Sequence, residues 1–484
     1  MTKPIPWTID DVLEATGGRL LAAADKGVFS GVGIDSRKIG PDEIFVAIPG
    51  HRYDGHDFLS NVAAEGVRCV IVHENRVDTL PISQWRTGKV ACIAVDDTVS
   101  ALGAMAAYQR NRAGIAVAAV TGSNGKTTTK EMAASVLGRN YNVLATPGNF
   151  NNEIGLPLTL LQLNSEHQAA VVELGMNNPG EIHRLSAICR PDIGVITNIG
   201  PAHLAGLGSI DAVAKAKAEI LENINAGGTA VINADDDYGQ WLASRTDRRV
   251  VFYGCGSTAE IRAEDIEQRE NGVCFKLVLP GESVSVTLPV RWRFMVYNAM
   301  AAAAVGYLMG VSAADISAGL AEFRPVSGRM AVYRTGTGAY IIDDTYNANP
   351  GSMKTAIASL AALSDRKRGI LVAGDMLELG DAAEELHEDI GRLAADAGIN
   401  RLYLAGEFAY RVAHGARSSG MKGGDVFVGA KEDIIKDLEQ WLEPGDWILI
   451  KGSRSTGMDE IVARLTADAS THATDPEGRE AEPE

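Results

Sequence analysis

The sequence predicts an α/β protein built from three domains and a short tail. Its 484 residues exceed the roughly 100 to 200 that one compact domain needs. Short β-branched runs alternate with helical patterns, and this alternation starts afresh near residue 326. The composition is that of a globular protein, with 46% hydrophobic and 22% charged residues. We expect domains at 1–113, 114–325 and 326–466, followed by an acidic flexible tail at 467–484.

The first domain is expected to be a small α/β unit. Residues 42–48 and 69–73 are typical of short strands. A helical pattern from about residue 97 to 112 follows them and is expected to connect this domain to the second one.

The second domain is expected to contain a central parallel sheet. An apolar run at 115–120 leads into a glycine-rich loop and then a helical segment at 126–137, which predicts strand, loop and helix. Helical patterns separate several of the later strands, so the strands should run parallel. These later strands are expected at 169–173, 193–197, 229–233 and 250–253.

The third domain is expected to be Rossmann-like, because each predicted strand precedes a helical segment. These strands are expected at 340–343, 369–373, 401–404, 425–428 and 447–450.

The charge balance excludes several classes of partner. Lysine and arginine total 45 against 62 aspartate and glutamate, a net charge of −17, which opposes binding to nucleic acid or anionic membranes. The most apolar stretch, 299–311, falls short of the ~20 residues that span a bilayer, and 1–11 does not resemble a secretory signal. The five cysteines form no CxxC pair. We expect a cytoplasmic protein without zinc or disulfides that binds neither nucleic acid nor membranes.

The strongest local motif is a phosphate-binding loop between a strand and a helix. Its glycines let backbone amides surround a phosphate, while the lysine, a hydroxyl and the helix N-terminus supply positive potential and a magnesium ligand. It departs from the GxxxxGK[ST] pattern because Val120 stands where that pattern has its first glycine. The alternative is a chance glycine turn. The loop comprises Thr121, Gly122, Ser123, Asn124, Gly125, Lys126, Thr127 and Thr128.

Two further polar residues follow the ends of predicted strands. Glu173 ends one strand and His203 follows the next. Ligands of open α/β sheets lie beyond the carboxyl ends of the strands, so both could reach the phosphates and Mg²⁺. Each alone is better explained as an ordinary loop residue, and only their order after the phosphate loop makes the two interpretations about equal. In the helical segment 209–223, Lys215 fits a solvated face.

The third domain and the end of the second carry three further patterns. The segment DDTYNANPGSM at 343–353 lies between a strand and a helix, where side chains commonly meet a ligand. The cationic loop 451–455 suits an anionic ligand and a solvated turn equally well. A GxGxx(G/A) match at 254–259 is better explained as a turn than as a nicotinamide cofactor site, because no amphipathic helix follows it.

Taken together, these motifs resemble the ATP-dependent Mur ligases of peptidoglycan synthesis over nearly the whole chain. Within that family, DDTYNANPGSM and GDMLELG (374–380) are most similar to the members that add D-Ala-D-Ala to a UDP-muramoyl tripeptide, and the DNPR-type signature of the preceding ligase is not found. The supporting motifs are DSRK (35–38), DEIFVAI (42–48), HRYDGHDF (51–58), GNFNNEIGLP (148–157), VELGMN (172–177), YNA (297–299) and SGR (327–329).

The resemblance implies ATP, two Mg²⁺ ions and a lysine carbamylated by CO₂. Lys126, His203 and Lys217 would be the catalytic residues, with Lys217 carbamylated, and Thr127, Glu173, His203 and Lys217 would hold the metal. The phosphate loop with Asn298, Arg329 and Asp344 would bind the nucleotide. The UDP-sugar peptide and D-Ala-D-Ala would contact Ser36, His51, Arg52, Asn151, Asn152, Asn347, Lys451 and Arg454.

The implied reaction activates a carboxylate as an acyl phosphate, which the dipeptide amine then attacks. The resemblance also implies a monomer whose first domain binds the UDP-sugar. Two alternatives remain: a folylpolyglutamate synthetase, which has a similar loop nearer its N-terminus, and a nucleotide-binding switch that performs no ligation.

Overall fold

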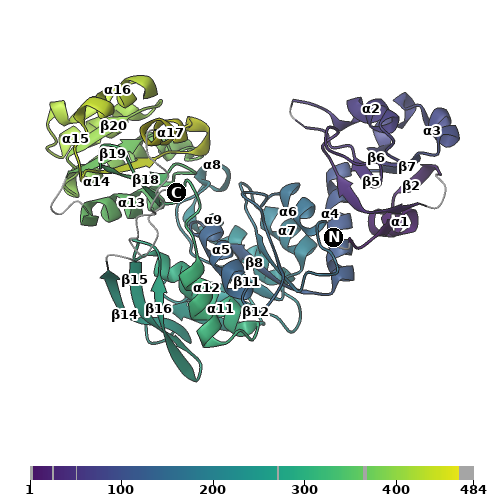
Figure 1. Ribbon diagram of the computed structural model, residues 1–484, viewed down its shortest axis with the longest axis horizontal. Coiled ribbons are helices and arrows are strands. Elements are labelled where there is room, and N and C mark those ends of the chain that lie inside the picture. The colour runs from purple at the N-terminus through teal and green to yellow at the C-terminus, as the bar shows by residue number, and fades with distance from the viewer. Residues whose placement is uncertain (1–3, 24–26, 51, 270–271, 364–367, 468–484) are drawn as a thin grey trace, which may run out of the picture.

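The computed structural model describes residues 4–23, 27–50, 52–269, 272–363 and 368–467. The N-terminal and C-terminal domains lie on opposite sides of one end of the central domain (Figure 1). The tail expected at 468–484 lies outside the described residues. Within the described ranges, no helix has the length and apolar character needed to cross a membrane.

The N-terminal domain is built on a five-stranded sheet of order β2-β7-β6-β5-β4, in which β2 alone is antiparallel. Its buried residues include Phe45, Val70 and Cys92. The strands are β1 (Trp7–Thr8), β2 (Arg19–Ala22), β3 (Val28–Phe29), β4 (Gly31–Gly33), β5 (Glu43–Val46), β6 (Cys69–His73) and β7 (Ala91–Val95), and the helices are α1 (Ile9–Thr16), α2 (Leu59–Ala64) and α3 (Ile82–Gly88).

Helix α4 (Thr98–Ala113) joins the first two domains, as the sequence predicts. Asp97 caps its N-terminus by accepting from the Ser100 amide, and Gly114 ends it in the left-handed region at φ 62°. The helix is tied to the central domain because Arg110 Nε donates to the Cys189 carbonyl at 2.9 Å. The position of the N-terminal domain is therefore set largely by this helix.

The central domain contains a nine-stranded sheet of order β16-β15-β14-β13-β12-β11-β8-β10-β9. Alternate residues of β8 enter two separate cores, since Ala118 and Val120 pack with α5 and α11 while Val117 and Ala119 pack with the helices of the other face. The parallel strands are β8 (Ala116–Thr121), β9 (Val143–Ala145), β10 (Ala169–Glu173), β11 (Ile193–Ile196), β12 (Thr229–Asn233) and β13 (Arg249–Gly254).

The sheet is not wholly parallel, which differs from the prediction. Strand β14 (Ile261–Arg269) pairs parallel with β13, but β15 (Gly272–Leu279) and β16 (Glu282–Leu288) extend it antiparallel. Many outward residues of this ribbon are polar or charged, which makes the segment resemble a loop. Its inward residues, such as Phe275 and Val286, enter the core.

Helices cover both faces of the central sheet. They are α5 (Lys126–Leu137), α6 (Gly155–Leu160), α7 (Glu181–Cys189), α8 (Leu204–Leu207), α9 (Ile210–Ala218), α10 (Gly239–Ala243), α11 (Met295–Leu308) and α12 (Ala313–Glu322).

The C-terminal domain has a six-stranded sheet of order β17-β18-β22-β19-β20-β21, with only β17 antiparallel. Strands and helices alternate along it, which confirms the predicted α/β class. The elements are β17 (Ala331–Arg334), β18 (Tyr340–Asp344), α13 (Pro350–Leu363), β19 (Gly369–Ala373), α14 (Ala383–Asp396), β20 (Arg401–Leu404), α15 (Ala409–Ser418), β21 (Val426–Val428), α16 (Lys431–Trp441), β22 (Trp447–Lys451) and α17 (Asp459–Thr466).

Candidate active site

The phosphate loop forms the turn between β8 and α5, where the sequence predicts it. Gly122 has φ 148° and Gly125 has φ 79°, both in the region that favours glycine. A Cβ on Gly122 would lie 1.8 Å from Thr197 Oγ1, and one on Gly125 would lie 2.5 Å from Asn298 Oδ1. No side chain caps α5, so its first amides remain directed at the loop. The loop therefore has the backbone of an anion-binding turn.

The loop is held rigidly by the segment that follows β11. The Asn124 amide donates to Asn198 Oδ1 at 2.9 Å, and the Asn124 carbonyl accepts from Thr197 Oγ1 at 2.6 Å. Ser123 Oγ donates to the Gly200 carbonyl at 3.0 Å. These contacts fix the loop before any ligand binds, which reduces the cost of organising it around a phosphate.

Three predicted residues meet at the start of α5. Lys126 Nζ donates to the Gly122 carbonyl at 2.9 Å. Burial lowers the pKa of Lys126, and the charge of Glu173 opposes this shift. Thr127 Oγ1 donates to Glu173 Oε2 at 2.7 Å, and Asn151 Nδ2 donates to Glu173 Oε1 at 2.8 Å. Glu173 is 1% exposed. A cation, a hydroxyl and a carboxylate are thus concentrated beside the loop.

His203 forms a contact with the C-terminal domain that the sequence does not reveal. Its Nδ1 lies 2.6 Å from Glu378 Oε2. The Ala205 amide also donates to the Glu378 carbonyl at 2.9 Å. The hydrogen bond from His203 is the first cause of the lowered pKa of Glu378.

Two lysines of α9 differ sharply in environment. Lys215 is exposed, which confirms the predicted solvated face, whereas Lys217 is 1% exposed. Burial lowers the pKa of Lys217 well below its usual value, and the charge of Lys126 adds to the shift. The Lys217 side chain makes no hydrogen bond or ion pair within the described part of the chain. Lys217 is thus a desolvated amine close to the phosphate loop.

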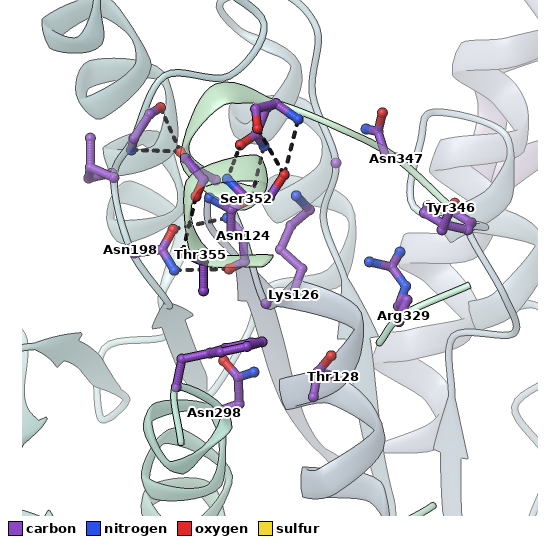
Figure 2. A pocket seen from close by; sticks show the side chains of 18 of the residues that line it. Asn124, Lys126, Thr128, Asn198, Asn298, Arg329, Tyr346, Asn347, Ser352 and Thr355 are labelled. Carbon is purple, nitrogen blue, oxygen red and sulfur yellow. Dashed lines mark hydrogen bonds between the residues drawn. The ribbon is translucent and has the colours of Figure 1, made fainter. Parts of the chain in front are cut away.

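A cavity of about 690 Å³ opens between the phosphate loop and the C-terminal domain. Lys126 and Arg329 converge in it, with Tyr346 and Asn347 beside them (Figure 2). The Arg329 guanidinium lies over the Tyr346 ring at 3.9 Å, and its buried Nε has no hydrogen-bond partner among the residues that the structure describes. Asn298, 8% exposed, lines the wall near Gly125. The cavity thus offers an unpaired buried donor and an aromatic face next to the loop.

Three further C-terminal residues of the cavity, Asp344, Asn347 and Lys451, form a cluster around one ion pair. Lys451 Nζ donates to Asp344 Oδ2 at 2.5 Å and to the Asn347 carbonyl at 2.8 Å. Lys451 is 2% exposed, so the solvated-turn alternative does not describe it. Arg454 is exposed, pairs with Asp459 at 3.2 Å and does not line the cavity.

Residues expected to bind the UDP-sugar lie apart from this cavity or at its edge. Ser36 and Arg52 belong to the N-terminal domain and do not line the cavity, and His51 lies outside the described residues. Asn151 and Asn152 do line it. Asn152 Oδ1 also accepts from the Gly155 amide at 2.8 Å, at the first residue of α6.

A second contact between domains was also missed in the sequence. Asn349 Nδ2 donates to Asn124 Oδ1 at 2.8 Å, so the C-terminal domain touches a side chain of the phosphate loop. The motif DDTYNANPGSM contains Asn349 and GDMLELG contains Glu378, but neither pattern indicates its partner.

The GxGxx(G/A) match at 254–259 is a turn between β13 and β14, and no helix follows it. Asp235 Oδ2 accepts from the Cys255 amide at 2.5 Å, which occupies this turn with an internal contact. This agrees with the interpretation of the segment as a turn.

Comparison with known proteins matches each domain to a Mur ligase model. The model "Mur ligase family, catalytic domain" matches residues 28–110, "Mur ligase middle domain" matches 120–306, and "Mur ligase, glutamate ligase domain" matches 328–454.

Whole-chain comparisons point to the same family. The UDP-N-acetylmuramoyl-tripeptide–D-alanyl-D-alanine ligase of Bacillus subtilis is 36% identical over 462 residues, which cover 95% of this chain and 98% of that protein. A crystal structure of MurF from Acinetobacter baumannii matches with a TM-score of 0.86 at 34% identity, covering 96% of this chain and 99% of the other. The structure of MurF ligase from Thermotoga maritima in complex with ADP matches with a TM-score of 0.77 at 27% identity, covering 93% and 98%. These matches extend across all three domains, and the chain belongs to the Mur ligase family.

Proposed function

We propose that this Mur ligase joins D-Ala-D-Ala to a UDP-N-acetylmuramoyl-tripeptide, converting ATP to ADP and phosphate. The observation that carries the proposal is the likeness, over 95% of the chain, to a ligase named for this reaction. The cavity supports this proposal, because it lies between the phosphate loop and the C-terminal domain, which contributes a cationic residue of its own. Formation of an amide between two bound substrates requires such a shared site.

The nucleotide is proposed to bind with its phosphates on the loop Gly122–Thr128. Arg329 Nε fits a polyanion because it is a buried donor without a hydrogen-bond partner among the described residues. The glycine conformations of the loop and the N-terminus of α5 fit one as well. Asn298 is proposed to approach the adenine, and Asp344 the ribose. The relative from Thermotoga maritima, whose structure is a complex with ADP, supports nucleotide binding by this chain.

Magnesium is proposed to be held by Thr127, Glu173 and His203, together with the nucleotide. Within the described ranges, no group of three or more His, Cys, Asp or Glu side chains could hold a metal. This fits Mg²⁺, which binds through one or two carboxylates and substrate phosphates. The Thr127 hydroxyl and Glu173 carboxylate are hard oxygen donors in direct contact. When bound, Mg²⁺ offsets the negative charge of phosphoryl transfer.

Lys217 is proposed to be carbamylated by CO₂. An amine must be neutral to attack CO₂, and burial favours the neutral form of Lys217. The carbamate would carry negative charge beside Lys126, whereas the unmodified amine has no anionic oxygen.

The chain's own residues then support two chemical steps. Lys126 faces the transferring phosphoryl group and stabilises its charge while the tripeptide carboxylate becomes an acyl phosphate. Docking of the C-terminal domain excludes water, which protects the acyl phosphate from hydrolysis. The D-Ala-D-Ala amine attacks the acyl carbon, and phosphate leaves. Asn347, Lys451 and Arg454 are proposed to meet the dipeptide.

The N-terminal domain is proposed to bind the uridine diphosphate end through Ser36, His51 and Arg52, while Asn151 and Asn152 contact the muramoyl part. We propose a monomer acting in the cytoplasm, where its nucleotide substrates are made. Sedimentation of the purified chain would test whether it is a monomer.

A coupled assay for ADP and phosphate tests the proposed reaction. Turnover should require ATP, UDP-muramoyl tripeptide and D-Ala-D-Ala together, and a new amide product should form in equal amount. A folylpolyglutamate-type ligase would instead turn over with folate and glutamate. A nucleotide switch would hydrolyse ATP without the peptide substrates.

A further inference from the structure

We propose that Glu378 is a positioning residue: from the C-terminal domain, it holds the imidazole of His203 in a fixed orientation at the active site. The inference rests on the proposed function, because it concerns how His203 is presented to the bound substrates. It makes the geometry of a central-domain side chain depend on docking of the C-terminal domain.

Glu378 contacts the central domain in two ways, through its side chain and through its backbone carbonyl. Glu378 Oε2 meets His203 Nδ1 at 2.6 Å, and the Glu378 carbonyl accepts from the Ala205 amide at 2.9 Å. The backbones also approach closely, since a Cβ on Gly380 would lie 3.3 Å from Ala205 Cα. Glu378 is therefore fixed relative to the turn that carries His203.

Both residues of the pair adopt an uncommon backbone conformation. His203 has φ 55° and Glu378 has φ 64°, which places two non-glycine residues in the left-handed region. A side chain in this region crowds the backbone and makes the conformation unfavourable. Strain of this kind persists where surrounding contacts over-determine it, and such positions cluster at functional sites.

The loop that carries Glu378 is anchored in its own domain. The Met376 amide donates to His387 Nε2 at 2.9 Å, and the Leu377 amide donates to Ser453 Oγ at 2.9 Å. The His387 ring is buried and stacked on Phe408 with centroids 4.5 Å apart. Glu378 is thus presented from a rigid base rather than from a free loop.

The orientation of the His203 ring depends on its hydrogen bond with Glu378. Across the described residues, Glu378 is the sole hydrogen-bond partner of the His203 imidazole. An Nδ1–H that donates to a carboxylate leaves Nε2 as the acceptor nitrogen. His203 lines the cavity together with Lys126. Carboxylates behind a working histidine fix its tautomer and ring orientation in this way.

Glu378→Ala and Glu378→Gln test the proposal, with Glu384→Gln as the matched control. Glu384 is an exposed glutamate of the same domain that pairs with Arg411 at the surface. Glu378→Ala should lower kcat by about 10- to 100-fold, while the KM values for ATP and the UDP-tripeptide stay within about 2-fold. Glu378→Gln can still accept from Nδ1 and should recover part of the lost kcat. The control should behave as wild type.

A second measurement reads the orientation directly. The ¹⁵N spectrum of the His203 ring should show the Nδ1–H tautomer in wild type and Glu378→Gln, and a mixture of tautomers in Glu378→Ala. A wild-type kcat in Glu378→Ala, an unchanged ring spectrum in that variant, or no recovery in Glu378→Gln would each overturn the proposal. If wild type itself fails to ligate, the proposed function fails, whereas the spectrum still tests the contact.

Discussion

Lys217 and Lys215 allow the effect of burial on a lysine amine to be compared within one helix. They lie two positions apart on α9, yet Lys215 is exposed and Lys217 is 1% exposed. We predict that CO₂ adds to Lys217 and not to Lys215. Lys217→Met removes the amine and keeps an apolar chain of similar length, and Lys215→Met makes the same change on the surface.

The difference in reactivity follows from the neutral fraction of each amine. A lysine with an ordinary pKa of about 10.4 is neutral in roughly one molecule in a thousand at about pH 7.4. Each unit by which burial lowers the pKa of Lys217 raises this fraction about tenfold. Protonation competes with carbamylation, so the occupancy of the carbamate should fall as the pH drops below the lowered pKa of Lys217 and stay high above it.

The assay is ¹³C NMR of the protein in ¹³C-labelled bicarbonate. One carbamate carbonyl signal per chain is expected in wild type and in Lys215→Met, and none in Lys217→Met. Lys217→Met should also lose ligase activity, and Lys217→Ala should regain part of its loss when short-chain carboxylates are added. A signal that survives in Lys217→Met, or full activity of that variant, would exclude Lys217 as the carbamylated residue.

The other predictions concern the phosphate loop and the dipeptide. Lys126→Ala should lower kcat by about 10²- to 10³-fold, because one preorganised charge donor is lost, and near-normal turnover would remove Lys126 from the site. Gly125→Ala, whose Cβ would lie 2.5 Å from Asn298 Oδ1, should weaken ATP binding measured by calorimetry, whereas Gly114→Ala, with nothing within 4 Å, should not. Arg454→Ala should raise the apparent KM for D-Ala-D-Ala in steady-state assays; an unchanged value would return Arg454 to the role of a solvated residue.

Local sequence patterns predicted much of the fold and the part of the site that the central domain contributes. The helix at 126–137 and the strands at 69–73, 369–373 and 401–404 have the predicted bounds, because apolar periodicity and turn residues mark them. The antiparallel ribbon β14–β16 was not predicted. Polar and charged residues of its outer face alternate with apolar residues of its inner face, so the segment resembles a polar loop.

The missed residues of the site share a physical cause. Glu378 meets His203 across 175 positions, and Asn349 meets Asn124 across 225. Such pairs depend on how two domains dock, which no spacing within one segment encodes. The burial of Lys217 is likewise a property of the packed sheet and not of its helix, whose neighbouring lysine is exposed.

In the proposed reaction, the carboxylate of the tripeptide is phosphorylated before the amide forms. Ligation with a tripeptide whose terminal carboxylate carries ¹⁸O at both oxygens is the direct test. One ¹⁸O atom is expected in each phosphate released, because the carboxylate oxygen that attacks ATP leaves with the phosphoryl group. Phosphate that contains no ¹⁸O while the amide forms would contradict it.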